Sequence, residues 1–441
     1  MKSKRLIFLE KLLRIMAKTV LARHKPTIVA VTGSVGKTTT KESIYKILAN
    51  FIDIRGSEKN YNNEIGVPLT IIGISGHSRK LSFWLKVFWR WIIVLFLPIK
   101  YPKVLVLEMG AYYPGDIKYL CEVAPVSVGV LTKIGTTHLE RFKTQKNIIQ
   151  EKGQLLRSLP SNGLAVFNYD DEKVRKIAEK INVNSISYGF SEGSKMRATD
   201  LVLIYESFVN SAGKSIKILK GLSFKLNYRG KIIPVRLEHC ISSSYVYGAL
   251  AAFCVGEYFG INLMKMVETV KGLTVVPGRM NLINGIKNSL IIDDTYNSAP
   301  DSLKVAVKTM SAIQANRKIA VLGDMLELGK EEDKSHLDVG LLLAKNNFDY
   351  FITVGRRMRK GGEKFAGEVQ SADRVFFFDD PAKAGLFLQD FIKPGDLLLI
   401  KGSQGLRMEK IVEEIMAQPN RKGELLVRQD EAWRATPFKK N

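Results

Sequence analysis

Several common sequence features are scarce or missing in this chain of 441 residues, and each absence excludes some kinds of protein. Its three cysteines (Cys121, Cys240 and Cys254) are too few and too widely spaced for a disulfide framework or a metal cluster, and they fit a reducing compartment. No low-complexity tract interrupts a composition that is 46% hydrophobic, so the chain is globular and long enough for two or three domains. No Gly-x-Gly-x-x-Gly turn follows any expected strand in the last third, which argues against an oxidoreductase.

Acidic residues are also scarce relative to basic ones. The chain has 43 Asp and Glu against 67 Lys and Arg, a formal net charge of +24. A nucleic acid, an anionic membrane, an anionic substrate or a generally basic proteome would each account for such a surplus. The basic residues are spread along the chain and form no basic arm, so the charge alone decides nothing, and we expect no nucleic-acid partner.

The first 25 residues carry apolar side chains at helical spacing over Leu6–Met16, among many basic ones. A signal peptide would need an uninterrupted apolar core, which Glu10, Lys11 and Arg14 break. The pattern therefore predicts a basic amphipathic helix over 1–25. It would either pack on the next domain or lie on an anionic membrane.

A second apolar stretch, Leu81–Ile99, contains Trp84, Trp89 and Trp91 beside Lys86 and Arg90. Its uncharged part, 91–99, is too short to cross a bilayer. Tryptophan with flanking cations is typical of an interfacial segment, and a buried or oligomer-forming helix or a true span are the alternatives. The interfacial interpretation places a cytoplasmic protein in peripheral contact with the inner face of the membrane.

Residues 28–43 read IVAVTGSVGKTTTKES, a β-branched run, a glycine turn and the start of a helix. Such a turn lets backbone N–H groups face phosphate oxygens, and the helix adds the positive end of its dipole. Lys37 would neutralise the terminal phosphates of ATP, and the Thr38 hydroxyl would bind Mg²⁺. The segment therefore predicts an ATP site built from Gly33, Ser34, Gly36, Lys37, Thr38 and Thr39.

Strands and helices alternate after that segment. Strands are expected at 104–107, 126–132 and 164–168, a β-rich hairpin region at 199–237, and five further strands between 289 and 400. This alternation predicts an α/β fold: a central P-loop ATPase domain with a parallel-rich sheet (26–275, with an apolar insertion at 81–100), then a Rossmann-like doubly wound domain (276–420) and a basic tail (421–441). Ligand sites of such sheets lie at the carboxyl ends of the strands, where Glu108 and His138 fall.

These motifs together resemble the Mur ligases, the ATP-dependent amide-forming enzymes of peptidoglycan precursor synthesis. Within the family the chain is most similar to the MurF type, which adds D-alanyl-D-alanine to UDP-N-acetylmuramoyl-tripeptide. The similar stretches cover residues about 26–415 in family order. They include TGSVGKTTTKE (32–42), NYNNEIGVPLT (60–70), LEMGAYYPGDIKYL (107–120), IGTTHLERF (134–142), QEKGQLL (150–156), PGRMNLI (277–283), IIDDTYNSAPDSL (291–303), VLGDMLELG (321–329) and PGDLLLIKGSQG (394–405).

The resemblance implies a catalytic role for each of several residues. Family members phosphorylate a substrate carboxylate with Mg²⁺-bound ATP, and an amine then attacks the acyl phosphate. Glu108 and His138 align with metal ligands, as does Thr38 of the phosphate loop. Lys152 lies 14 residues after His138, where the family carries a lysine that CO₂ converts to a metal-binding carbamate (N6-carboxylysine). A surface lysine is the alternative, since Gln154 stands where many members have glutamate.

Further residues are assigned to the nucleotide and the substrates by the same resemblance. Arg279 aligns with an arginine that reaches ATP from the second domain, and Asp294 with an acceptor of the ribose hydroxyls. Asn297 resembles a nucleotide-site residue. The remaining candidates are substrate residues: Asn62 and Asn63 for the muramoyl peptide, and Lys401 and Ser403 for the dipeptide.

Departures from the family pattern keep two alternatives open. About 25 residues precede the phosphate-binding strand, fewer than the UDP-binding domain of family members needs. Ser244 and Gly248 stand where the family has a histidine and an adenine-contacting asparagine. The chain could therefore be a Mur-like ligase of a different or lipid-linked acceptor, or a non-catalytic ATP-binding protein of a membrane-associated assembly.

Overall fold

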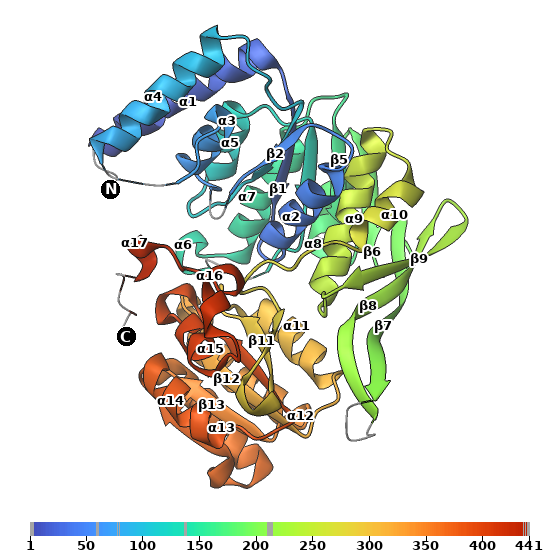
Figure 1. The fold of residues 1–441 in the computed structure, drawn as a ribbon. Coiled ribbons are helices and arrows are strands. Elements are labelled where there is room, and N and C mark those ends of the chain that lie inside the picture. The colour runs from blue at the N-terminus through green and yellow to red at the C-terminus, as the bar shows by residue number, and fades with distance from the viewer. Residues whose placement is uncertain are drawn as a thin grey trace.

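Two separate β-sheets, one from each half of the chain, organise the molecule (Figure 1). The structure is a computed structural model that describes residues 4–58, 61–76, 78, 80–135, 139–209, 215–434, 436 and 438. Both sheets are parallel-rich and carry helices, so the predicted α/β class is confirmed. The predicted domain boundaries remain predictions, although the last strand of the first sheet ends at Glu238 and the first strand of the second begins at Asn281.

The first sheet has the strand order β2-β3-β1-β4-β5-β6-β7-β8-β9 over the described residues. Pairing is parallel from β2 to β7 and antiparallel from β7 to β9, where the sequence predicted hairpins. The strands are β1 (Thr27–Thr32), β2 (Ile54–Gly56), β3 (Val104–Glu108), β4 (Val128–Leu131), β5 (Leu164–Asn168), β6 (Asn184–Gly189), β7 (Met196–Val209), β8 (Ser215–Tyr228) and β9 (Lys231–Glu238).

Helices cover both faces of this sheet because residues along β1 alternate between two cores. Val29 and Val31 pack with α2 (Lys37–Leu48), α9 (Ser243–Tyr258) and α10 (Leu263–Val270), whereas Ile28 and Ala30 pack on the other side. That other face is covered by helices that include α3 (Gly66–Ile72), α5 (Asp116–Val123), α7 (Gln145–Arg157) and α8 (Glu172–Ala178), with the short α6 (Leu139–Phe142) before α7. The strand β1 is thus buried on both faces, as central parallel strands are.

The second sheet has the order β10-β11-β15-β12-β13-β14 and is parallel apart from β10. It too is doubly wound, since its strands bury residues in two cores on opposite faces. Its strands are β10 (Asn281–Asn284), β11 (Leu290–Asp294), β12 (Arg317–Gly323), β13 (Tyr350–Val354), β14 (Val375–Phe378) and β15 (Asp396–Lys401). Its helices are α11 (Pro300–Ser311), α12 (Glu332–Lys345), α13 (Arg356–Val369), α14 (Pro381–Phe391) and α15 (Glu409–Ile415), with 3-10 turns η1 (Ile286–Asn288), η2 (Gly329–Glu331), η3 (Ala372–Arg374) and η4 (Gln404–Leu406).

Two helices form a pair at the end of the molecule away from the second sheet (Figure 1). The predicted N-terminal helix is longer than its apolar pattern, since α1 spans Lys4–His24, and the apolar insertion forms α4 (Leu81–Phe96). The Trp91 indole donates to the Thr19 hydroxyl at 2.9 Å, and the backbone carbonyl of Val94 contacts the His24 ring at 2.8 Å. None of the described helices is long and apolar enough to cross a bilayer.

The predicted basic tail is partly folded. Residues after 418 form η5 (Pro419–Arg421), α16 (Lys422–Leu425) and α17 (Glu431–Arg434). Between them the buried Arg428 pairs with Glu409 at 2.9 Å and donates to the carbonyl of Thr295 at 3.1 Å. The segment therefore supports the loop that follows β11, where Asp294 and Asn297 lie.

Candidate active site

The predicted phosphate loop joins β1 to α2 in a conformation that requires glycine twice. Gly33 has φ +146°, and a Cβ there would lie 2.0 Å from the Thr132 hydroxyl oxygen. Gly36, at φ +86°, stands at the N-cap of α2, which has no side-chain cap. The first N–H groups of α2 are therefore left for an outside acceptor, as at anion-binding helix ends.

Glu108 lies beside this loop because β1 and β3 are neighbouring parallel strands, with Val31 opposite Glu108. The Thr38 hydroxyl donates to Glu108 Oε2 at 2.8 Å, and Asn62 Nδ2 donates to Oε1 at 3.0 Å. Burial raises the pKa of Glu108, but the charges of Lys37 and two other cations and the hydrogen bond from Asn62 together outweigh burial and lower the pKa below its usual range. Glu108 is thus held as a buried carboxylate at the phosphate loop.

Arg279 reaches the same loop from the second half of the chain. Its Nη2 donates to the Thr38 hydroxyl oxygen at 3.0 Å, and its guanidinium carbon lies 3.9 Å from the centre of the Tyr296 ring. Its Nε is buried without a hydrogen-bond partner among the described residues. A half-buried guanidinium with an unused, buried donor beside a phosphate loop suits an anionic ligand.

Asp294 and Lys401 form a buried ion pair at the ends of two adjacent parallel strands, β11 and β15. Lys401 Nζ donates to Asp294 Oδ2 at 2.6 Å and to the carbonyl of Asn297 at 2.8 Å. Burial lowers the pKa of Lys401, which Asp294 partly offsets. Lys401 therefore holds Asp294 and its loop in place.

Lysines 37 and 152 give the first half of the site its positive charge. Lys152 lies on α7 and is buried, and within the described part of the chain its amine makes no ion pair. Burial and the nearby Lys37 lower the pKa of Lys152 to about 7. Burial also lowers the pKa of Lys37, whose amine lies 3.5 Å from the Ser34 carbonyl oxygen.

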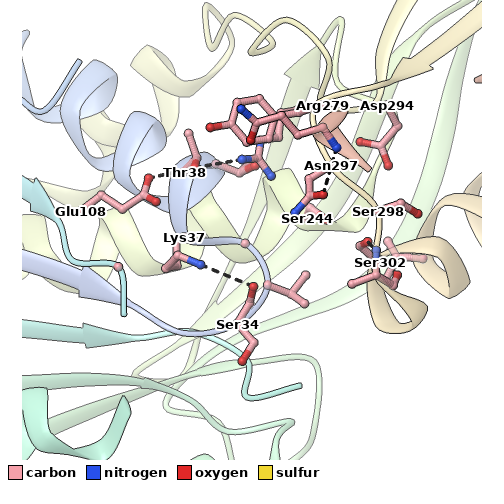
Figure 2. Close-up of a pocket in the computed structure, with 18 of the residues that line it drawn as sticks. Ser34, Lys37, Thr38, Glu108, Ser244, Arg279, Asp294, Asn297, Ser298 and Ser302 are labelled. Atoms are coloured by element: carbon pink, nitrogen blue, oxygen red, sulfur yellow. Dashed lines mark hydrogen bonds between the residues drawn. The ribbon is translucent and has the colours of Figure 1, made fainter. Parts of the chain in front are cut away.

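A cavity of about 170 Å³ brings most of the predicted residues together (Figure 2). In Figure 2, Thr38 stands between Glu108 and Arg279, while Asp294, Asn297, Ser298 and Ser302 approach from the second half. The predicted residues that line the cavity are Ser34, Gly36, Lys37, Thr38, Thr39, Asn62, Glu108, Lys152, Arg279, Asp294, Asn297 and Lys401. A second, larger cavity of about 710 Å³ adjoins it, and Val35, Gly36, Ser244 and Val305 line both.

Three predicted residues do not line the 170 Å³ cavity, and a fourth is not described. Gly33 belongs to the loop but packs against Thr132. Asn63 Oδ1 accepts from the N–H groups of Ile65 and Gly66 at 3.2 and 2.9 Å, so it fixes the start of α3. Ser403 accepts from the N–H of Leu326 at 2.9 Å, so it ties two loops of the second sheet. His138 lies outside the described residues.

Two tyrosines that the sequence analysis did not single out belong to the site. Tyr296 stacks under Arg279, and the hydroxyl of Tyr245 donates to the Arg279 carbonyl at 3.0 Å. Tyr296 lies in the stretch quoted above for 291–303 and Tyr245 follows Ser244, but nothing in the local pattern marks either of them. Gly248 lies against α2 instead, where a Cβ would sit 2.5 Å from the Ser43 hydroxyl oxygen, so the glycine allows α9 to pack closely on α2.

The described residues could hold a metal ion only together with a ligand. No group of three or more His, Cys, Asp or Glu side chains suitable for a metal occurs among them. The Glu108 carboxylate and the neutral Thr38 hydroxyl are nevertheless adjacent, and both residues line the cavity. Oxygen donors of this kind fit Mg²⁺ that completes its shell with phosphate oxygens and water.

Sequence comparison divides the chain into two family domains. The Mur ligase middle domain matches residues 31–79 and 94–255, and the "Mur ligase, glutamate ligase domain" matches 278–404. The gap at 80–93 falls within α4, so most of that helix lies outside the shared domain pattern.

Relatives and solved structures agree with this division. The chain is 26% identical to the UDP-N-acetylmuramoyl-tripeptide–D-alanyl-D-alanine ligase of Bacillus subtilis, over 92% of this chain and 79% of that protein. The MurF ligase of Thermotoga maritima in complex with ADP matches with a TM-score of 0.74 and 27% identity, covering 92% of this chain and 83% of that one. MurF from Acinetobacter baumannii matches with a TM-score of 0.75 and 26% identity, covering 92% and 80%. The chain belongs to the Mur ligase family.

Proposed function

We propose that this chain is an ATP-dependent, ADP-forming ligase that adds D-alanyl-D-alanine to a UDP-N-acetylmuramoyl-tripeptide in peptidoglycan precursor synthesis. Curated relatives from Bacillus, Buchnera and Rickettsia that carry this activity in their names match about nine-tenths of the chain. We expect it to work in the cytoplasm, where ATP is made available to ligases.

One observation carries the proposal: the cavity is shared by both halves of the chain. Lys37, Thr38 and Glu108 line it from the first half, and Arg279 and Asp294 line it from the second. The 3.0 Å hydrogen bond from Arg279 to Thr38 joins the two sets. A site split in this way can place a nucleotide triphosphate on one half and close the other half over it.

The residues fit a reaction through an acyl phosphate. A carboxylate oxygen of the tripeptide would attack the γ-phosphorus of ATP, and ADP would leave. The amine of D-alanyl-D-alanine would then attack the acyl carbon, lose its proton and expel inorganic phosphate. Lys37 and Arg279 are placed to offset the negative charge that gathers on the transferred phosphoryl group. Asp294, which Lys401 holds, would accept from the ribose hydroxyls.

Metal binding completes this proposal. Thr38 and Glu108 would hold Mg²⁺ with phosphate oxygens, and His138 would join them as its motif indicates. Bound Mg²⁺ would supply charge neutralisation on the phosphates. Lys152 would enter the shell as a carbamate, formed when its neutral amine attacks CO₂ and loses a proton. Its burial beside the cavity, without an ion-pair partner among the described residues, supports this role.

Substrate residues follow from their positions. Asn62 lines the cavity and binds Glu108, so it is placed to contact the muramoyl peptide near the metal. Asn63 and Ser403 would act indirectly by fixing the loops next to the substrates. Lys401 would position Asp294 and, with the neighbouring Gln404, border the path of the dipeptide.

The test is turnover of purified protein with ATP, Mg²⁺, D-alanyl-D-alanine and a panel of UDP-muramoyl peptides. ADP is measured by a coupled assay and the product by mass spectrometry. We expect ADP and ligated product in equal amounts with the tripeptide acceptor. Product only with a different or lipid-linked acceptor would overturn the substrate assignment. ATP binding without turnover on any acceptor would point to a non-catalytic protein.

A further inference from the structure

The outer side of the α1/α4 pair carries apolar side chains that the fold does not cover. On α4 only Val87 and Val94 are buried. Leu81, Leu85, Phe88, Trp89 and Phe96 are exposed, and their spacing of three, four and seven places them on one side of the helix. The largest of these side chains, Trp89, is 62% exposed. An apolar stripe of this length on a described surface marks an interaction site.

A second stripe runs along α1, the partner helix. Phe8, Leu12 and Ile15 are exposed at spacings of four and three, and Phe8 is 68% exposed. The opposite side of α1 buries Leu13 and Met16 against α3 and α4. Both helices are therefore anchored through one face and present the other face to the outside.

Cations border these stripes and acids do not. Lys4, Lys11 and Lys18 are exposed at intervals of seven residues, so they form a row beside the stripe on α1. Lys80 and Lys86 are exposed at and near the start of α4. The helix α4 contains no acid, and the only acid of α1 is the half-buried Glu10.

We propose that this outward face of α1 and α4, the helix-pair surface, docks the protein on an anionic lipid bilayer. Exposed Trp, Phe and Leu side chains would enter the headgroup boundary while the lysine rows contact anionic lipid. A second copy of the chain is the weaker occupant, because two such faces would bring their lysine rows together without acids to pair with them. The domain pattern of the family passes over 80–93, so the shared fold does not require this helix.

In this proposal α1 and α4 lie parallel to the membrane surface. No described helix could span a bilayer, and both helices are held along their length by the Trp91–Thr19 hydrogen bond and the buried cores beneath them. The surface lies at the end of the molecule away from the second sheet, so docking leaves the cavity between the two halves free (Figure 1).

The experiment is co-sedimentation of the full chain with vesicles of phosphatidylcholine alone or with about 30 mol% phosphatidylglycerol. At roughly 50 mM salt we expect the protein to pellet with the anionic vesicles only, and to be released at about 500 mM. The combined changes Leu85→Ser, Phe88→Ser and Trp89→Ser should lower the bound fraction at least about tenfold, as should Lys4→Glu, Lys11→Glu and Lys18→Glu together.

Matched controls use exposed residues of the second half. Leu337→Ser, Leu341→Ser and Leu386→Ser remove the same number of exposed apolar side chains, and Lys334→Glu, Lys383→Glu and Lys393→Glu change the net charge equally. These variants should bind vesicles like the unchanged protein. Thermal unfolding checks that every variant is folded. The proposal is overturned if the folded protein stays in the supernatant, or if the controls lose binding equally. It is also overturned if light scattering shows a dimer that the α4 variant abolishes while vesicles do not bind.

Discussion

Arg279 donates to the hydroxyl of Thr38 at 3.0 Å, although 241 residues separate them in the chain. The same hydroxyl donates to Glu108, so a single oxygen connects the phosphate loop, the end of β3 and the second half of the chain. Thr38 is also the residue proposed to bind Mg²⁺. In the proposed enzyme, the contact between the two halves and the arrangement of the metal site would therefore be coupled through one side chain.

Changing Lys37 to Ala should abolish ligation. Lys37 is the only cationic side chain within the loop 33–36 and its first helical residue, and its loss removes several kcal/mol of transition-state stabilisation, a fall of roughly 10³-fold or more in kcat. Lys304→Ala, at an exposed position of α11, is the control and should leave the rate unchanged. Product formation by Lys37→Ala within about threefold of the unchanged enzyme would refute the phosphate-loop assignment.

Lysine should not be able to replace Arg279 in catalysis, so Arg279→Lys should lose most of the activity. Lysine keeps the charge but lacks the planar group that stacks on Tyr296 and the second donor nitrogen. We expect kcat to fall about 10²-fold while ATP still binds, measured by steady-state kinetics and by calorimetry with a non-hydrolysable ATP analogue. Tyr296→Phe keeps the stacking ring and should retain most activity. Equal rates for Arg279→Lys and the unchanged enzyme would show that only charge matters.

Lys152 should destabilise the uncarbamylated protein in acid. Its pKa, lowered to about 7, lies below the ordinary 10.5, so the folded state binds fewer protons between these values. Burial of Lys152 therefore destabilises the folded state most below pH 7, and this destabilisation disappears as the pH rises from about 7 to 10.5. In CO₂-free buffer, Lys152→Met should gain at least about 1.4 kcal/mol more stability at pH 6 than at pH 9. A pH-independent difference in unfolding free energy would contradict this.

The sequence predicted those parts of the site that depend on consecutive residues, and not those that depend on contacts between distant segments. The phosphate loop and Glu108 were predictable because a strand, a glycine turn and a helix follow each other directly, and Glu108 ends its own strand. Lys401 was expected to face the dipeptide, but it pairs with Asp294. That pairing arises because β11 lies beside β15, and the order of strands in a sheet cannot be predicted from either segment by itself.

Neighbouring residues with the same chemistry could not be separated from sequence either. Asn62 and Asn63 were both assigned to substrate, yet Asn62 binds Glu108 and Asn63 holds the first turn of α3. The sequence of α4 is apolar around most of the helix, apart from the row Ser82, Lys86 and Arg90, so its pattern could not show which apolar side is buried. Tertiary packing alone decides such cases.

Arg428→Ala should loosen the loop that carries Asp294 and Asn297. The change leaves the buried carbonyl of Thr295 without its donor and removes one partner of Glu409, which keeps Arg407. We expect a loss of about 2 kcal/mol in chemical unfolding and a raised KM for ATP. Arg421→Ala removes an exposed pair with Glu424, which solvent screens, and should leave stability almost unchanged. An unchanged KM for ATP in Arg428→Ala would show that the C-terminal segment does not support the nucleotide site.

The most direct test of the account follows the oxygen atom that the acyl phosphate transfers. The acceptor carboxylate is labelled with ¹⁸O, the reaction is run with ATP, Mg²⁺ and D-alanyl-D-alanine, and the released phosphate is analysed by mass spectrometry. Attack of the carboxylate on the γ-phosphorus, followed by attack of the amine on carbon, predicts one ¹⁸O in each phosphate released with product. Unlabelled phosphate, or phosphate release without ligated product, would contradict the proposed ligase reaction.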